Sequence, residues 1–357
     1  MDSARAAAGV WQGRGPGAAL ARAALLPFEA LFRAAVATRG ALYDAGLLTA
    51  LHTPLPAIGV GNLTVGGTGK TPVSAWIVSE LLARGACPAV VLRGYGGDEP
   101  LVHATLNPGV PVVAAADRIA GVHQARAAGA DIAVLDDAFQ HRRARCVADV
   151  VLVSADRRDA RNGRTRLLPA GPWRESPTAL RRASLALVTR KAAAADDALA
   201  TLRWIAIHAP TTPTAVASLE LGPLRRAPAP HVADDARDAE RPLSAANGAR
   251  ILAVSAIGDP GAFRRQLEAI GGRVEAATYG DHHRYTPSDV RHLARRAHAA
   301  DLVVCTLKDA VKLAPLWPRE APPLWYVTQR VTIERGREEL DRVLEAVLAA
   351  RPRSTIP

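Results

Sequence analysis

The stretch that decides the fold is Ile58-Gly-Val-Gly-Asn-Leu-Thr-Val-Gly-Gly-Thr-Gly-Lys-Thr-Pro72. The apolar residues 57–60 predict a buried strand, and Pro72 suits the first turn of a helix, where a missing N–H costs little. Between them, glycines let backbone N–H groups converge on a phosphate at the start of that helix, without obstruction by side chains. The stretch therefore predicts a phosphate-binding loop between a strand and a helix.

The nucleotide-binding residues are expected to be Thr64, Val65, Gly66, Gly67, Thr68, Gly69, Lys70 and Thr71. Lys70 is expected to reach the β- and γ-phosphates of ATP, and the hydroxyl of Thr71 is expected to bind Mg²⁺. The loop departs from the strict GxxxxGK[ST] pattern because Thr64 holds the first glycine position. A glycine-rich turn with a chance lysine is the alternative, and Gly-Lys-Thr between a strand and a helix argues against it.

Length and charge narrow the class of protein. The 357 residues are enough for two domains, and the net charge of +11 suits nucleic acid, an anionic membrane surface or a phosphorylated substrate. No zinc finger, aromatic RNA-binding motif or lysine-rich patch supports nucleic acid, and no obligate protein partner is inferred. The three cysteines are widely spaced, which argues against a disulfide framework or a zinc site. The sequence contains no run of ~18 apolar residues, so it predicts no membrane-spanning helix.

From residue 56 onward, apolar segments alternate with helical ones. Strands are expected at 57–60, 89–92, 110–114, 131–135, 150–153 and 185–188, with helices at 70–84 and 117–128. This alternation predicts an α/β fold with a P-loop NTPase-like parallel sheet and helices on both faces. Residues 222–249 are expected to be a linker or long loop. A smaller C-terminal α/β domain is expected at 250–357, with strands 251–254, 302–305 and 324–327 and helices 260–270, 287–299 and 336–350.

The first 50 residues are expected to form a separate N-terminal helical segment, before a kinase domain at 51–221. Over residues 18–48, Arg22, Glu29 and Arg33 share one stripe of an amphipathic helix, and large apolar residues lie mostly on the opposite side. Pro27 is expected to break this helix into two pieces. The pattern fits either a helix packed on the core or a helix lying in a membrane surface, with its arginines at the headgroups.

Asp136 and Asp137 follow four apolar strand residues, as at the end of a Walker B strand. One carboxylate is expected to hold Mg²⁺ while the other positions a substrate or a water. The basic, polar segment that follows, with Gln140, His141 and Arg142, is expected to meet an anionic substrate. Arg93 and Arg174 are further candidates for the substrate phosphate or the transition state, and Tyr95 is a candidate substrate contact.

These residues predict a Mg-ATP-dependent phosphotransferase or ATPase. Asp98, in Gly-Asp-Glu-Pro, and the pair His282 and His283 could each be ordinary turn residues. The chief rival is a membrane-associated ATPase switch of the deviant Walker A type. Such proteins carry a lysine just before the paired glycines, and here that position is Val65.

A set of motifs in order along the chain resembles the tetraacyldisaccharide 4'-kinase family. The motifs are Thr64-Val-Gly-Gly-Thr-Gly-Lys-Thr-Pro72, Arg93-Gly-Tyr95, Gly97-Asp-Glu-Pro100, Asp136-Asp-Ala-Phe-Gln-His141, Leu168-Pro-Ala-Gly-Pro-Trp-Arg-Glu175, Gly258-Asp-Pro-Gly-Ala-Phe263, Asp281-His282 and Thr306-Leu-Lys-Asp-Ala-Val-Lys-Leu313. The resemblance extends across about residues 20–350, nearly the whole chain.

The resemblance implies a kinase that phosphorylates the 4'-hydroxyl of a lipid A disaccharide 1-phosphate with ATP, giving lipid IVA. It implies peripheral attachment at the cytoplasmic face of the bacterial inner membrane through the N-terminal helix. Asp98 and His282 fall on the family's acid–base pair, with His283 a neighbour, and Asp136 and Asp137 fall on its Mg²⁺ and nucleotide site.

This sequence departs from the family pattern at three places. The hairpin that the family usually carries between its Arg-Gly-Tyr and Gly-Asp-Glu-Pro motifs is replaced by Gly96-Gly97. Ala138 stands where glycine is usual, a change that matters only if the backbone there needs a positive φ. Leu92 replaces the serine that commonly precedes the arginine. The shortened hairpin raises the question of how far Asp98 can reach.

Overall fold

The computed structural model of the chain describes residues 9–11, 13, 15–94, 97–157, 165–228 and 239–351. The chain packs into two compact units. Unit 1 comprises Met1–Gly94, His103–Ser218 and Ile333–Pro357, and unit 2 comprises Tyr95–Val102 and Leu219–Thr332. Strands β9 (Thr214–Arg226) and β14 (Leu324–Arg335) each begin in one unit and end in the other.

Unit 1 is built on a parallel sheet, as the alternation of strands and helices predicted. Its strands lie in the order β9-β8-β7-β2-β5-β3-β4, and the paired neighbours in this series run parallel. They are β2 (Ala57–Asn62), β3 (Pro88–Leu92), β4 (Val112–Ala114), β5 (Ile132–Asp136), β7 (Ala148–Ser154), β8 (Leu185–Arg190) and the first part of β9. The two-residue strands β1 (Leu51–His52) and β6 (Ala144–Arg145) pair separately.

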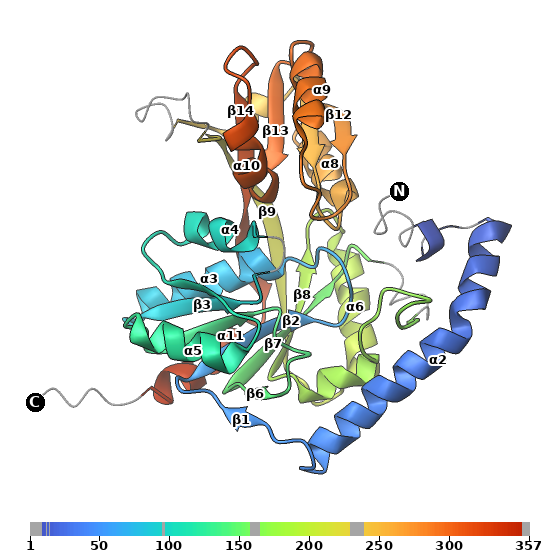
Figure 1. The fold of residues 1–357 in the computed structure, drawn as a ribbon, viewed down its shortest axis with the longest axis vertical. Helices are drawn as coiled ribbons and strands as arrows, with labels where there is room; N and C mark the ends of the chain where they lie inside the picture. Colours follow the sequence, from blue (N-terminus) through green and yellow to red (C-terminus); the bar gives the residue numbers. More distant parts are fainter. Residues whose placement is uncertain are drawn as a thin grey trace, which may run out of the picture. The chain divides into compact units, whose positions relative to one another are not determined.

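Helices flank this sheet, which confirms the predicted fold class (Figure 1). They are α3 (Lys70–Ala83), α5 (Arg118–Ala127), α6 (Ala195–His208) and α11 (Arg337–Ala349), with a 3₁₀ turn at Pro177–Arg182. Apart from the edge strand β4, the strands are nearly continuous runs of buried apolar residues, because helices exclude water from the sheet. One cluster joins α5 to β3 and β5, and another joins α6 and the 3₁₀ turn to β7 and β8.

The register of the sheet brings the motif residues to one edge. Val60 of β2 pairs with Asp136 of β5, so Asn62, at the end of β2, and Asp136, at the end of β5, both lie at the carboxyl edge. Ligands of parallel α/β sheets gather at this edge. Gly61 has room only for hydrogen, because a Cβ there would lie 2.5 Å from the Cβ of Phe139. The segment after β5 therefore packs directly against the end of β2.

The strands of unit 2 lie in the order β12-β11-β13-β14-β9, with β10 (Glu240–Arg241) antiparallel to β9. β11 (Arg250–Ser255), β12 (Arg273–Thr278), β13 (Leu302–Thr306) and β14 pair in parallel. The helices are α8 (Pro260–Ala269), α9 (Pro287–Ala297) and α10 (Leu307–Leu313), with 3₁₀ turns at Leu243–Ala246 and Ala314–Leu316. Phe263, Leu267 and Trp325 are among its core residues.

Helix α2 (Pro16–Asp44) is a single long helix beside the sheet of unit 1 (Figure 1). The expected break at Pro27 is wrong: the helix continues through this residue. Pro27 forfeits one backbone hydrogen bond, but its fixed φ is compatible with a helix and the side chain is exposed. Among the described residues, no helix is both long and apolar enough to cross a membrane.

Several elements were not expected from the sequence. Asp98-Glu-Pro looked like a turn, yet helix α4 (Glu99–Leu106) starts there, since proline and acidic residues suit the first turn of a helix. Helices α6 and α10 and strand β12 were also missed. Residues 222–226, placed in the predicted linker, belong to β9, and residues 229–238 of that linker lie outside the described part. The final helix α11, assigned to the C-terminal domain from the sequence, packs in unit 1.

Candidate active site

The predicted phosphate loop connects β2 to α3 in unit 1. Gly66 and Gly69 have φ values of 113° and 93°, which L-residues with side chains rarely adopt, so these two positions require glycine. Gly69 is the N-cap of α3, and Lys70 and Thr71 occupy its first turn. The unpaired N–H groups and positive dipole end of this helix favour an anion.

The loop is held in place by neighbouring segments. Thr189 Oγ1, in β8, donates to the Thr68 carbonyl at 2.8 Å, and Lys191 Nζ donates to the Gly67 carbonyl at 2.7 Å. The backbone N–H of Val65 donates to Pro172 at 2.8 Å. Carbonyls fixed in this way cannot turn toward a bound phosphate, whose negative charge they would repel. The end of β8 thus presets the loop for an anion.

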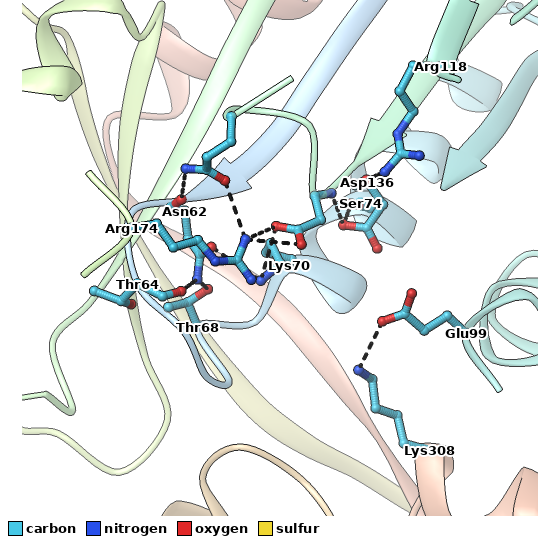
Figure 2. A network of polar contacts seen from close by, with 12 residues as sticks. Asn62, Thr64, Thr68, Lys70, Ser74, Glu99, Arg118, Asp136, Arg174 and Lys308 are labelled. Carbon is cyan, nitrogen blue, oxygen red and sulfur yellow. Dashed lines mark hydrogen bonds and ion pairs between the residues drawn. The ribbon is translucent and has the colours of Figure 1, made fainter. Parts of the chain in front are cut away.

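Lys70 lies in a polar network that joins the phosphate loop to Asp137, which follows β5, and to Arg174, which lies between β7 and β8 (Figure 2). Its Nζ is 3.3 Å from Asn62 Oδ1 and 3.6 Å from Asp137 Oδ1. Arg174 donates to both oxygens of Asp137, at 2.9 and 3.1 Å, and to Gln140 at 3.3 Å. Two cations therefore meet on one carboxylate, and their charges are available to a polyphosphate.

Asp136 is held by a different set of donors. Its Oδ1 accepts from Ser74 Oγ at 3.2 Å, and its Oδ2 lies 2.9 Å from His103 Nε2. Arg118 donates to its backbone carbonyl at 3.4 Å (Figure 2). Asp136 is buried whereas the side chain of Asp137 is 39% exposed, so the adjacent carboxylates have distinct environments. Asp136 is fixed in one orientation, while Asp137 faces the cations.

The donors at this edge fit Mg²⁺. A hydroxyl from Thr71 and carboxylates from Asp136 and Asp137 are hard oxygen ligands. The described residues contain no group of three His, Cys, Asp or Glu side chains able to hold a metal by themselves. Mg²⁺ is usually bound by one or two carboxylates together with substrate phosphates rather than by an all-protein cage. The arrangement is therefore suited to a metal that arrives with a nucleotide.

The predicted substrate residues lie in different places. Gln140 donates to the Asn62 carbonyl at 2.8 Å and joins the network of Arg174. His141 is half-buried, and burial, followed by the charge of Arg118, lowers its pKa. Arg142 lies against α2 instead, where it donates to Asp44 at 2.6 Å and to Gly40 at 2.9 Å. Arg93 is exposed just after β3, and Tyr95 lies outside the described residues.

A second cluster, in unit 2, contains Asp98 and His282. Asp98 is buried at the start of α4, and its Oδ1 lies 3.5 Å from Nδ1 of His282. Its Oδ2 lies 3.6 Å from Nζ of Lys312 on α10. Despite the shortened hairpin, Asp98 thus meets His282 rather than standing alone. His283 is committed elsewhere, with its Nε2 3.0 Å from Asp289.

The charges of this cluster favour an ion pair. Burial raises the pKa of Asp98, but His282 and then Lys312 outweigh it and hold the value at about 2. The contact with Asp98 raises the pKa of His282, against the effect of burial. Asp98 is therefore ionised at neutral pH, and its oxygens accept no hydrogen bond from the described residues. A buried carboxylate of this kind can accept a hydrogen bond or a proton from a ligand.

Backbone strain marks both clusters. Among the described residues other than glycine, positive φ occurs at Asp137 (52°) and at His282 (59°). Such strain persists where surrounding structure enforces it, often at functional sites. Ala138 does not share it, so alanine in place of the family's usual glycine needs no special backbone conformation.

Some residues of these clusters were not singled out from the sequence. Asn62 lies inside the quoted phosphate-loop stretch, and Thr189 and Lys191 follow the predicted strand 185–188. Their positions, at the ends of predicted strands, were therefore recognisable as places where ligand-binding residues occur. No motif marked Ser74 within the predicted helix 70–84, and His103 lies in α4, a helix that was not expected. Lys312 belongs to a quoted motif, but nothing in the sequence tied it to Asp98.

Comparison with known proteins agrees with this geometry. A sequence model of the tetraacyldisaccharide-1-P 4'-kinase family matches residues 21–97 and 96–349. The tetraacyldisaccharide 4'-kinase of Anaeromyxobacter sp. (strain K) is 40% identical over 372 residues, covering 96% of this chain and 95% of that protein. The enzyme of the same name from Syntrophus aciditrophicus is 34% identical, covering 93% of this chain and 96% of the relative.

A solved structure is also similar. The crystal structure of "apo" form LpxK from Aquifex aeolicus, in complex with ATP, superimposes with a TM-score of 0.67 at 27% identity. The match covers 91% of this chain and 99% of that one. Sequence and fold agree over nearly the full length, and the chain therefore belongs to the tetraacyldisaccharide 4'-kinase family.

Proposed function

We propose that the protein transfers the γ-phosphate of ATP to the 4'-hydroxyl of a tetraacyl disaccharide 1-phosphate, giving lipid IVA in the biosynthesis of lipid A. Membership of the kinase family gives the reaction class. The observation that carries the proposal is the buried Asp98 carboxylate, paired with His282, in a chain that also has a preset phosphate loop. The first can accept the proton of a hydroxyl, and the second can bind ATP.

In this proposal unit 1 holds the nucleotide. The N-terminus of α3 binds the phosphates, and Lys70 places a positive charge where negative charge shifts during transfer. Arg174 orients Asp137 through two hydrogen bonds to its carboxylate. Thr71, Asp136 and Asp137 would hold Mg²⁺, which supplies neutralisation of phosphate charge.

Unit 2 supplies the proton acceptor. The sugar oxygen forms a bond to the γ-phosphorus as the bond from that phosphorus to the β,γ-bridging oxygen breaks, and ADP leaves. The hydroxyl proton passes to the pair formed by Asp98 and His282, which takes it up as a unit. His282 in its neutral form, next to ionised Asp98, is the state that can accept this proton.

Helix α2 supports attachment to a membrane surface. Its polar stripe faces the protein: Glu29 is buried and accepts from the N–H of Leu167 at 3.0 Å, and Arg22 donates to the carbonyls of residues 10 and 13. Phe32 packs against the core of unit 1, but the apolar residues Leu20, Phe28 and Leu31 face outward and are 74%, 59% and 69% exposed. A core-packing helix would turn these residues inward, so α2 fits a membrane surface better.

This orientation alters the expected role of the arginines. Arg22 and Arg39 donate to backbone carbonyls of unit 1, and Arg33 pairs with Glu29 at 2.7 Å. Membrane binding is therefore assigned chiefly to the apolar face of α2, with the overall positive charge of the chain favouring anionic lipid. We infer attachment to the cytoplasmic face of the inner membrane, where ATP is present.

The direct test supplies labelled ATP and a tetraacyl disaccharide 1-phosphate in mixed micelles. The proposal expects label in a product that is one phosphate heavier, with the phosphate at the 4'-position by mass spectrometry and NMR. Lys70→Ala is the matched control and should give none. Release of free phosphate without lipid labelling would instead support the rival ATPase switch and overturn the proposal.

A further inference from the structure

Lys312 has no part in the function described so far, yet its ammonium lies between two buried carboxylates. Its Nζ is 3.6 Å from Oδ2 of Asp98 and 3.8 Å from Oδ1 of Asp309, and the side chain is only 15% exposed. A buried lysine is costly unless its charge is paired. Asp98 and Asp309 provide that pairing, and all three residues belong to unit 2.

Asp309 fixes one end of this arrangement. It is fully buried, and its Oδ1 accepts from the N–H of Ala256 at 3.0 Å and from the hydroxyl of Tyr285 at 2.9 Å. Its Oδ2 is 2.6 Å from Oγ1 of Thr306, the N-cap of α10. A carboxylate with three such partners cannot swing away, so the cation beside it has a defined position.

The other end is the candidate base. Asp98 makes no hydrogen bond to the described residues, and His282 and Lys312 flank its two oxygens separately. The Tyr285 ring also contacts the lysine, with Nζ 5.6 Å from the ring centroid. The lysine therefore approaches one oxygen of Asp98 and leaves the other to His282.

We propose that Lys312 is a positioning residue for Asp98: anchored by Asp309, its ammonium orients the carboxylate and sets the proton affinity of the Asp98–His282 pair. This inference rests on the proposed role of that pair in phosphoryl transfer. Lys312 acts through Asp98 and does not itself accept a proton. It gives the motif Thr306-Leu-Lys-Asp-Ala-Val-Lys-Leu313 a function, since the Thr306 cap holds Asp309 and one further turn of α10 places Lys312.

The sign of the effect follows from charge. Around the pair lie the cations Lys312 and Lys308 and the carboxylates Asp281 and Glu99, with Asp309 behind Lys312. Removing the charge of Lys312 lets the pair bind a proton more tightly. The acid limb of the kcat profile, which reports loss of that proton, should therefore move to higher pH.

The experiment compares Lys312→Met with Lys312→Arg. For Lys312→Met we expect the midpoint of the acid limb to rise by about one pH unit. Below the limb kcat should then be about tenfold lower, and it should recover at high pH, with KM for ATP unchanged. Lys312→Arg should stay near the wild type. Arg330→Met removes an exposed positive charge of unit 2 that pairs with Glu220, and it should not move the limb.

Two further variants make the result decisive. If Lys312→Met does not fold, Lys312→Met with Asp309→Asn removes both charges. A smaller upward shift is then expected, because loss of the Asp309 carboxylate partly offsets loss of the ammonium. An unmoved acid limb in a folded variant would overturn the inference, as would a higher KM for the lipid without a shift, which would place Lys312 on the substrate. Asp98→Asn tests the underlying function separately: if it keeps full activity, the base assignment itself fails.

Discussion

Nδ1 of His282 lies 3.5 Å from Oδ1 of Asp98, although the two residues are far apart in the sequence. Asp98 precedes α4, and His282 lies in the segment between β12 and α9 with a strained, positive φ. Neither segment alone distinguishes a catalytic residue from a turn residue. Their meeting in one buried cluster supports the acid–base assignment that family resemblance implied.

The first prediction concerns pH. The ion pair lowers the pKa of Asp98 to about 2 and raises that of His282 above its ordinary 6.5. Proton acceptance requires the pair without its titrating proton, so kcat should rise with pH through a limb above 6.5. The measurement is kcat at saturating ATP and lipid from pH 5 to 9. A flat profile across this range would contradict proton uptake by the pair.

The same shifts affect stability in opposite directions. Asp98 has a lowered pKa, so its contribution to the free energy of unfolding is present above its ordinary pKa of 3.8 and is lost as pH falls toward about 2. His282 has a raised pKa, so its contribution to the free energy of unfolding is complete below pH 6.5 and is lost as pH rises through the raised pKa of the folded state. His282→Ala should therefore destabilise the protein more at pH 5 than at pH 9, measured as the shift of the denaturation midpoint.

The sequence predicted unit 1 well because each feature there is local. The glycines, Lys70 and the apolar strand before them lie in one stretch of sequence. Parallel strands that are buried on both faces appear in the sequence as almost continuous apolar runs. The two aspartates after β5 were found in the same way. Thr189 and Lys191 were missed because their contacts with the phosphate loop depend on which strands are neighbours, and no local pattern encodes that order.

The orientation of α2 shows another limit. Periodicity identified a polar and an apolar face, but not which of them meets the protein. The buried hydrogen bonds of Glu29 decide it, and they depend on residues 166 and 167, distant in sequence. Pro27 was taken as a break because local propensity disfavours proline within a helix. Yet the helix is held on both sides of it: Arg22 donates to the carbonyls of residues 10 and 13, and Glu29 accepts from the N–H of Leu167.

A second prediction distinguishes Lys70, which is proposed to bind the transferred phosphate, from Lys191, which holds the phosphate loop in place. Lys70→Ala should lower kcat at least about 100-fold, since it removes a charge aimed at the transferred phosphate. Lys191→Met should instead raise KM for ATP about tenfold, because it loses one charge-assisted hydrogen bond to the Gly67 carbonyl. Steady-state kinetics check both, with circular dichroism for folding. Normal turnover in folded Lys70→Ala would refute the phosphate-loop assignment.

A third prediction concerns the membrane. Leu20→Glu, Phe28→Glu and Leu31→Glu together should abolish co-sedimentation with vesicles of anionic phospholipid, because they place charge on the outward face of α2. Ile207→Glu is the matched control, since Ile207 is 75% exposed but lies on α6, and it should bind as the wild type does. Equal sedimentation of both variants would mean that α2 is only structural.

A fourth prediction concerns the anchor of α2. Glu29→Ala removes the acceptor for Leu167, Arg33 and Arg166, and we expect it to lower the free energy of unfolding by about 1–3 kcal/mol. Burial raises the pKa of Glu29, but these hydrogen bonds outweigh it, so the effect should be present above pH 4.5 and fade on acidification. Glu345→Ala, at an exposed site on α11, should have little effect on the denaturation midpoint.

The central claim is that Asp98 and His282 act as one proton acceptor, and a double-mutant cycle on kcat tests it most directly. Asp98→Ala and His282→Ala should each lower kcat by about 10²–10⁴-fold, the usual range for a general base, with ATP affinity unchanged. Because the pair acts as a unit, the double variant should be little worse than the worse single one. Losses that multiply in the double variant, or a normal kcat in His282→Ala, would contradict the account.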